Sequence, residues 1–334
     1  MAIIKFIPED FVVKEILGLD LFEHGANHIY RLKKINYTSE RAVSQICRSL
    51  HLPQKFSGYA GSKDKPAITY QYISLKGVKK DKVESLELKD LELEFFGYAK
   101  ESLKLGLLKG NSFEIVIRDL PDDFKLDKPS NLLIPNYFDQ QRFSNANFDI
   151  GMAILKNDFK LAIEILIKTD KDYVDTLKEY LDTHLNDYVG ALRKLPNKIL
   201  LFYVHSIQSY FFNEILADSI LKHSSKTYSS TYSCGNFVFS DLLSDYGISK
   251  VPLIGYMNRD FNDLLAKYDL TPNSFIIRSF KNLSLEGDER DAFIKVKHFS
   301  LSELMDDEYF KNRKKVIAKF ELQSGSYATI VLKA

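Results

Sequence analysis

The period of the apolar residues changes twice along this chain, and that change limits the possible folds more than any other feature. As far as about residue 120, apolar side chains recur at every second position in several short runs, as in half-buried β-strands. Between residues 152 and 221 they recur with the period of α-helices, and alternating segments return near the carboxyl end. This order predicts an α+β domain that is interrupted by a helix-rich insertion.

The same periodicity predicts the individual elements. A helix should begin at Thr38 or Ser39, whose hydroxyls can cap it, and should run to about Leu50. Further helices are expected at 152–167, 173–185 and 199–221. Strands are expected at 11–16, 28–35, 69–75, 91–99, 112–120, 227–239, 274–280, 316–322 and 326–334. The length of 334 residues favours two domains.

Composition places the chain among ordinary globular proteins. Hydrophobic residues make up 45% of it, enough for a sizeable core. Its two cysteines, Cys47 and Cys234, are far apart and belong to no CxxC pair, which excludes a disulfide scaffold and fits a reducing compartment. No signal-like segment and no apolar run long enough to cross a bilayer is visible. We therefore expect a cytoplasmic protein without a membrane partner.

Net charge does not indicate a nucleic-acid partner, because the formal value is only +1. Local clusters of basic residues would be needed for RNA binding. Two exist, namely Lys76, Lys79, Lys80 and Lys82, and then Arg313, Lys314, Lys315 and Lys319. The interpretation that we prefer from composition and spacing is a solvated face in each case.

The segment GYAGSKDKPA at 58–67 is the best candidate for a chemical site. Its glycines allow a tight backbone, and Asp64 stands between Lys63 and Lys65, whose charges favour an ionised carboxylate. Such an aspartate can be a nucleophile, a general base or a metal ligand. A solvated surface turn explains the same residues and is the better interpretation from local pattern only. A phosphate-binding P-loop is excluded, because the required spacing and the following Ser or Thr are missing.

Metal chemistry has no support in the sequence. The seven histidines form neither an HExxH motif nor the HxE and PCxxC pair of zinc deaminases. His205 lies within a predicted amphipathic helix, where a partly buried structural role is the ordinary interpretation. We expect no metal and no other cofactor.

The string GYAGSKDKPAITYQYIS resembles the signature loop of the TruD family of tRNA pseudouridine synthases, whose pattern is G-x-K-D-x-x-A-x-T-x-Q. Five further segments resemble family motifs in the same order along the chain. These are PEDFVVKE at 8–15, KLGLLKGNSFEIVIR at 104–118, IPNYFDQQRFS at 134–144, HSIQSYFFN at 205–213 and SGSYATIVL at 324–332. Six ordered motifs over almost the full length are hard to obtain by chance.

The resemblance implies a function and a set of site residues. Asp64 would be the nucleophile that isomerises a uridine, usually uridine 13 of tRNA, to pseudouridine without a cofactor. The residues implied to surround the uridine are Phe11, Asn111, Tyr327, Lys63, Gln71, Phe113 and Arg142. The implied fold is a catalytic domain with a mixed, largely antiparallel pseudouridine-synthase-like sheet at 1–149 and 296–334, and a helix-rich α+β insertion domain at 150–295. We expect a monomer that binds tRNA.

Other interpretations of these residues stay open. Phe11 and Phe113 alternate with apolar neighbours, so simple core packing explains them equally well. Asn111 can be an ordinary turn residue, and Arg142 can belong to a structural ion pair. Asp139 and Ser144 depart from the family pattern, which has glycine at both positions, so the local backbone there is in question. A tRNA-binding or chaperone protein without catalysis is the first alternative function. An aspartate-using glycoside hydrolase is the second, although it needs a carboxylate partner that the sequence does not reveal.

Overall fold

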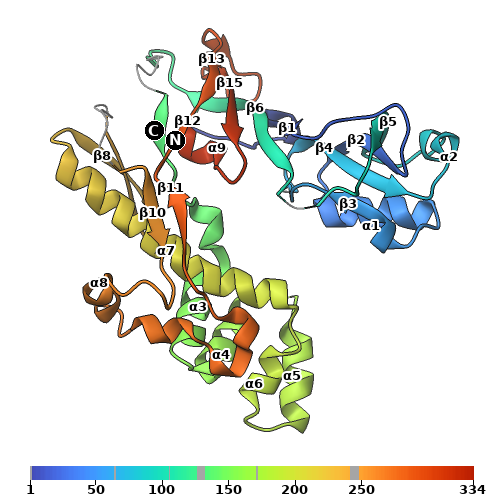
Figure 1. Ribbon diagram of the computed structural model, residues 1–334. Helices are drawn as coiled ribbons and strands as arrows, with labels where there is room; N and C mark the ends of the chain where they lie inside the picture. The colour runs from blue at the N-terminus through green and yellow to red at the C-terminus, as the bar shows by residue number, and fades with distance from the viewer. Residues whose placement is uncertain (1, 64, 105, 126–131, 171, 241–247) are drawn as a thin grey trace. The chain divides into compact units, whose positions relative to one another are not determined.

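The computed structural model describes residues 2–63, 65–104, 106–125, 132–170, 172–240 and 248–334 (Figure 1). The chain forms two compact units. The first comprises Met1–Leu132 and Lys295–Ala328, and the second comprises Leu133–Ile294 and Thr329–Ala334. Each unit therefore combines segments that are distant in the sequence.

The first unit is built on a mixed, curled sheet. In the described residues this sheet has nine strands, of which seven follow the order β13-β15-β6-β1-β4-β2-β5, while β14 pairs with β15 and β3 with β4. The β1–β4 pair is parallel, and the other strand pairs of this sheet in the described residues are antiparallel. The strands are β1 (Phe11–Leu17), β2 (Asn27–Ile35), β3 (Ser57–Tyr59), β4 (Ile68–Lys76), β5 (Leu91–Ala99), β6 (Leu108–Leu120), β13 (Lys297–Leu301), β14 (Met305–Asp306) and β15 (Lys314–Gln323).

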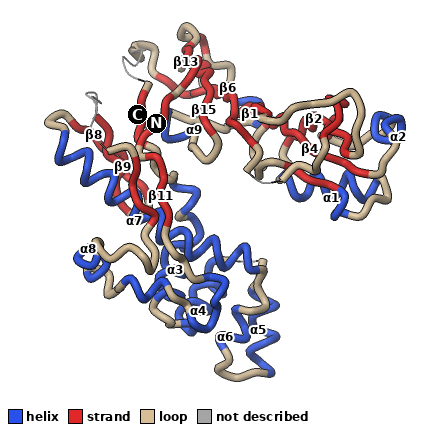
Figure 2. Tube along the Cα trace, viewed as in Figure 1, coloured by secondary structure: helices blue, strands red, loops and turns tan. Residues whose placement is uncertain are grey.

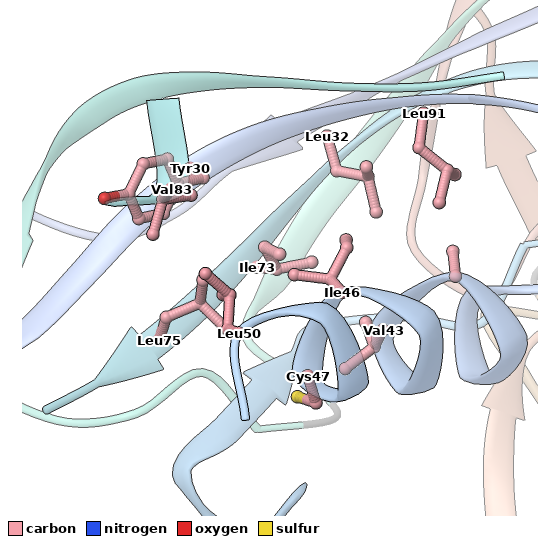
Figure 3. Packing of buried hydrophobic residues seen from close by; sticks show 11 residues of the cluster. Tyr30, Leu32, Val43, Ile46, Cys47, Leu50, Ile73, Leu75, Val83 and Leu91 are labelled. Atoms are coloured by element: carbon pink, nitrogen blue, oxygen red, sulfur yellow. The ribbon is translucent and has the colours of Figure 1, made fainter. Parts of the chain in front are cut away.

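Helix α1 (Ser39–Ser49) covers one face of this sheet. Thr38 caps the helix, since its hydroxyl accepts a hydrogen bond from the backbone N–H of Arg41. The apolar side of α1, including Val43 and Ile46, packs on Leu32 and Ile73 of β2 and β4 (Figure 3). The short helices of the unit are α2 (Lys80–Glu84), η1 (Pro8–Asp10) and η2 (Gln54–Phe56). The burial of the apolar side chains between α1 and the sheet holds the start of α1 against β2 and β4.

The second unit is mainly helical (Figure 2). Its longest helix, α7 (Asn197–His223), packs on α3, β9 and β10 and is buried along much of its length. None of the helices in the described ranges has an apolar stretch that would suffice for a membrane span. The other elements are β7 (Leu133–Pro135), η3 (Gln140–Arg142), η4 (Ser144–Ala146), α3 (Asn147–Leu155), α4 (Phe159–Thr169), α5 (Val174–Thr183), α6 (Tyr188–Leu192), β8 (Thr227–Tyr232), β9 (Gly235–Ser240), β10 (Lys250–Leu253), α8 (Asn262–Ala266), η5 (Pro272–Phe275), η6 (Arg278–Leu283), β11 (Asp288–Asp291) and β12 (Phe293–Lys295), with α9 (Ala328–Val331) at the carboxyl end.

Most predicted strands and helices are confirmed, with shifts of a few residues at their ends. The helix predicted at 152–167 is two helices, α3 and α4. Asn157 adopts a positive φ of 58° between them, and the Asp158 side chain caps α4 by accepting from the N–H of Leu161. The strand predicted at 227–239 is the β8–β9 hairpin.

Two predicted strands are wrong. Residues 274–280 form parts of two 3₁₀ helices, because Thr271 and Pro272 start a helical turn there. Their short apolar run suits a strand and a buried helical turn equally well. Residues 326–334 contain helix α9 in place of a strand, after a turn in which Gly325 takes a φ of 83°. That turn ends β15 and directs the chain away from the sheet.

A buried guanidinium joins three parts of the first unit. Arg118 of β6 donates to both oxygens of Asp10 at 2.8–3.0 Å and to Asp307 at 2.9 Å. All three side chains are almost completely buried, so each charge depends on its partners. Arg118 also pairs with the half-exposed Glu308 at 3.0 Å. The hydrogen bond that Arg118 donates to Glu308, together with one from Lys315, lowers the pKa of Glu308 to about 2.

We predict that Arg118→Met destabilises the protein strongly, because Asp10 and Asp307 would remain buried without a counter-charge. The free energy of unfolding should fall by about 3–5 kcal/mol. Arg31→Gln is the matched control, since Arg31 forms an exposed pair with Glu94, and its loss should cost less than about 1 kcal/mol. Urea unfolding followed by circular dichroism measures both. Equal losses in the two variants would contradict the role given to the buried cluster.

Candidate active site

A row of polar side chains crosses one face of the sheet in the first unit. Glu15 of β1 lies opposite Asn111 of β6, and Val13 lies beside Thr69 of β4. Because alternate residues of a strand share a face, Asn111, Glu15, Thr69 and Gln71 point to the same side. All four side chains are buried. Buried polar groups in adjacent strands are costly, so this row is a candidate for a binding or catalytic site.

Glu15 connects the row to the loop that precedes Asp64. One carboxylate oxygen accepts a hydrogen bond from the backbone N–H of Tyr72 at 2.8 Å. The other oxygen lies 2.8 Å from Nζ of Lys63. The two groups form an ion pair, but the angles do not suit a hydrogen bond between them. A Cβ atom at Gly61 would be 3.3 Å from that Nζ and 3.5 Å from the carboxylate oxygen. Glycine at 61 therefore leaves room for the pair.

The amino end of α1 holds the same loop at a second point. The hydroxyl of Ser39 donates to Oε1 of Gln71 at 2.7 Å and accepts from the backbone N–H of Lys63 at 2.9 Å. Residue 63 is thus held through both its backbone and its side chain. Asp64, the predicted nucleophile, lies outside the described residues, whereas Lys65 after it is exposed.

Three atoms of the row have unused hydrogen-bonding capacity. Nε2 of Gln71, Oδ1 of Asn111 and Oγ1 of Thr69 are buried and have no partner within the described ranges. Leaving such an atom unpaired costs roughly 1–3 kcal/mol. Together they offer an amide donor, a carbonyl acceptor and a hydroxyl, which can bind a ligand with a polar edge.

The structure explains why Gly110 precedes Asn111. A Cβ atom at Gly110 would lie 2.3 Å from the carbonyl oxygen of Leu322 in β15, so only glycine permits this approach of the two strands. The turn after β15 begins here, with the N–H of Ser324 bonded to the carbonyl of Lys109 at 3.2 Å. Tyr327, which is half-buried, follows three residues later. Asn111 and the segment that carries Tyr327 are therefore brought to the same end of β15.

Phe11 and Phe113 lie on the same sheet face as the row and pack in its core. Their ring centroids are 6.3 Å apart, and Phe113 stacks on Phe320 at 5.5 Å. Both side chains are buried, and Nζ of Lys5 lies 4.2 Å from the centroid of the Phe11 ring. Core packing accounts for these contacts, and the rings border the polar row at the same time.

Arg142 belongs to the second unit. Its Nε donates to the hydroxyl of Ser209 in α7 at 3.1 Å, and its guanidinium lies over the ring of Phe202. In the same motif Asp139 stands where the family pattern has glycine. Its φ of −80° is open to any residue, and its carboxylate accepts hydrogen bonds from Thr329 and Lys333. The departure is thus accommodated by an ordinary backbone and a local ion pair.

The basic cluster near the carboxyl end is structural. Each of its cations is in an ion pair: Arg313 with Asp119, Lys314 with Asp306 and Asp122, Lys315 with Glu308, and Lys319 with Glu114. In the other cluster Lys80 pairs with Glu84, and Lys82 donates to the carbonyl of Leu50. The solvated face expected from the sequence is therefore wrong for part of the carboxyl-terminal cluster, because Arg313, Lys314 and Lys315 are only 34%, 26% and 20% exposed and are held in ion pairs.

Sequence reasoning missed part of the row. The sequence contained one usable sign of the buried row at Glu15. This residue is charged, although the alternate positions before it on the same strand, Phe11 and Val13, are apolar. Ser39 was seen only as a helix-capping residue. Lys34 of β2 is fully buried beside Thr69 and donates a hydrogen bond to the carbonyl of Tyr37. It belongs to no motif that the sequence reveals. Among the residues that the structure describes, no group of His, Cys, Asp and Glu has the arrangement of a metal site.

Comparisons with known proteins agree over the whole chain. The family model described as tRNA pseudouridine synthase D (TruD) matches residues 1–179, 167–231 and 231–334. "Probable tRNA pseudouridine synthase D" of Nanoarchaeum equitans is 31% identical, with 99% of this chain and 97% of that protein covered. "Probable tRNA pseudouridine synthase D 1" of Methanococcus maripaludis is 29% identical, with 97% of each covered. A Methanosarcina mazei crystal structure assigned to TruD has a similar fold, with a TM-score of 0.68 at 23% identity over 99% of this chain and 92% of that one.

We predict that Glu15 and Lys63 are energetically coupled. Lys63→Met should cost about 3 kcal/mol of stability, because it leaves a buried carboxylate without its cation. Adding Glu15→Gln should recover part of that loss, giving a coupling energy above about 1 kcal/mol in a double-mutant cycle. The exposed pair Lys33–Glu92 is the control and should show less than about 1 kcal/mol. Additive losses at Glu15 and Lys63 would show that the pair does not hold the loop.

Proposed function

This chain belongs to the tRNA pseudouridine synthase D (TruD) family and is therefore a tRNA pseudouridine synthase, an isomerase, and we propose that it converts uridine 13 of tRNA to pseudouridine with Asp64 as the nucleophile. The observation that carries the proposal is the anchoring of residue 63. Its side chain is paired with Glu15 and its backbone with Ser39, immediately before Asp64 and beside a row of buried polar groups. A reacting group needs such a rigid support.

The reaction requires the uridine to leave its stack. The atoms that a carboxylate can attack, C1′ of the ribose or C6 of the base, are inaccessible in a stacked nucleotide. Extruding the base costs a few kcal/mol, and stacking on an aromatic ring returns about 1–3 kcal/mol. Tyr327 is the ring that we assign to this contact, with Phe11 as a second candidate. Phe113 supports Phe11 from its edge.

The buried amides match the edge of a uracil. A uracil offers two carbonyl acceptors and one N–H donor, so it can bind an amide donor and an amide acceptor together. Oδ1 of Asn111 and Nε2 of Gln71 are an acceptor and a donor without partners in the described parts of the chain. We assign both to the uridine, with Lys63 as the residue that holds Asp64 in place. Arg142, whose guanidinium lies beside α7, is assigned to the RNA.

Two routes use the same carboxylate. In the first, Asp64 bonds to C1′ while the N1–C1′ electron pair leaves with the uracil. In the second, Asp64 adds to C6 before the N1–C1′ bond breaks. Either way the turned base forms a C5–C1′ bond, the carboxylate departs, C5 loses its proton and N1 gains one. The product is an isomer, so no oxidant or reductant is consumed.

The catalytic domain that we propose comprises 1–149 and 296–334, with 150–295 as the insertion domain. The first and last segments carry the signature loop, Asn111 and Tyr327. The compact units divide at 132 and 133, somewhat before the proposed limit, so β7, η3 and η4 pack with the helices of the second unit.

Asp64→Asn should abolish pseudouridine formation and leave the affinity for tRNA within about threefold of the wild type. The amide keeps the size of the carboxylate but is no nucleophile. Product is measured by mass spectrometry after incubation with tRNA, and affinity by fluorescence anisotropy. Asp20→Asn, at an exposed carboxylate of the same unit, is the control and should keep full activity. Product formed by the Asp64 variant would reject the nucleophile.

Pseudouridine should be absent at position 13 of tRNA in cells without this protein and should return when the gene is restored. Mass-spectrometric mapping of cellular tRNA measures this directly. A purified tRNA with cytidine at position 13 should gain no pseudouridine. If the wild-type protein binds tRNA but modifies no uridine, the non-catalytic tRNA-binding alternative is correct. Modification at another position would change the substrate and leave the chemistry intact.

A further inference from the structure

The exposed face of α1 carries a cavity of about 450 Å³. Its walls include two arginines, Arg41 and Arg48, and the polar side chains of Tyr37, Gln45 and Gln54. We propose that this cavity binds the phosphate backbone of the RNA substrate, with the two guanidinium groups as its anchors. The proposal rests on the tRNA substrate proposed above and adds a contact surface that no sequence motif indicated.

The spacing of the two arginines makes them act on one ligand. Arg48 lies seven positions after Arg41, close to two full turns, so both side chains leave the same side of the helix about 10 Å apart along its axis. Both are exposed, while the opposite side of α1 is buried in the core cluster. A single small anion is too short to reach both groups, whereas a nucleic-acid strand is long enough.

The charges of Arg41 and Arg48 are available to a ligand. Neither guanidinium forms an ion pair with any residue that the structure describes, in contrast to Arg31, Arg118 and Arg313. Guanidinium groups bind phosphates through paired N–H donors, and they release counterions when they do so. Glu40 supplies a negative charge to the walls, so the two arginines leave the cavity with a net charge of +1. A polyanion fits this balance.

The cavity is linked to the polar row through the first residues of α1. Thr38, which lines it, caps α1, and the adjacent Ser39 binds both Gln71 and the backbone of Lys63. A uridine that reaches the row would therefore have its neighbouring backbone beside the first turn of α1. This continuity favours the tRNA substrate over an unrelated anion.

The test uses the full chain with Arg41→Gln and Arg48→Gln combined. Affinity for unmodified tRNA is measured by fluorescence anisotropy between 50 and 300 mM salt. The Kd should rise about tenfold near 0.1 M salt, and the slope of log K against log salt should become shallower by about 1.5, as expected for two lost phosphate contacts. The lysine double variant, Arg41→Lys with Arg48→Lys, keeps the charges and should restore most of the slope.

Arg31→Gln with Lys33→Gln is the matched control. It removes two cations from the same unit, but these are already paired with Glu94 and Glu92. Its slope should stay near that of the wild type. The proposal is overturned if the Arg41 and Arg48 variant binds like the wild type, or if the control loses as much. Failure of the proposed function is measured separately, as a wild-type protein that forms no pseudouridine in tRNA. The comparison of tRNA affinities between the variants and the wild type can still be made in that case.

Discussion

The ion pair between Glu15 and Lys63 is the interaction on which the candidate site depends. A carboxylate buried in a sheet needs a cation close by, and the one that serves Glu15 comes from a loop, not from a neighbouring strand. The pair therefore draws that loop against β1 and β4. Ser39 then fixes the backbone of residue 63 from α1, so helix, sheet and loop meet at one point. Residue 63 is thereby held through both its side chain and its backbone.

Much of the first unit could be predicted because its signals are local. The strands on either side of the signature loop alternate regularly, and Thr38 caps α1 as its side chain predicts. The two wrong strands, at 274–280 and 326–334, are short apolar runs in which a two-residue period does not exclude a helical turn. Pro272 and Gly325 decide these cases, since each sets the backbone beside the run. Strand pairing was not predictable, as register depends on contacts between distant segments.

The candidate site divides in the same way. Residues in recognisable motifs, such as Asp64, Asn111 and Gln71, could be named from the sequence. Of these three, the structure describes Asn111 and Gln71, and both lie in the polar row. Ser39 and Lys34 could not, because their importance arises from neighbours that are far away along the chain. Asp139 is instructive for the opposite reason. It breaks the family pattern, yet its ordinary φ and its contacts with Thr329 and Lys333 make the exchange harmless.

The distribution of charge explains why a protein of net charge +1 can serve a polyanionic substrate. Runs of basic residues attract attention in a sequence, but the run from Arg313 to Lys319 lies among carboxylates that neutralise it. Arg41 and Arg48 are separated by six residues and form no run, yet the helix places them on the same side, two turns apart, and both lack a carboxylate partner in the described residues. Because a paired cation has already released part of its solvation and counterions, it has less to offer a phosphate. The state of pairing, more than the density of basic residues, therefore decides which surface attracts RNA.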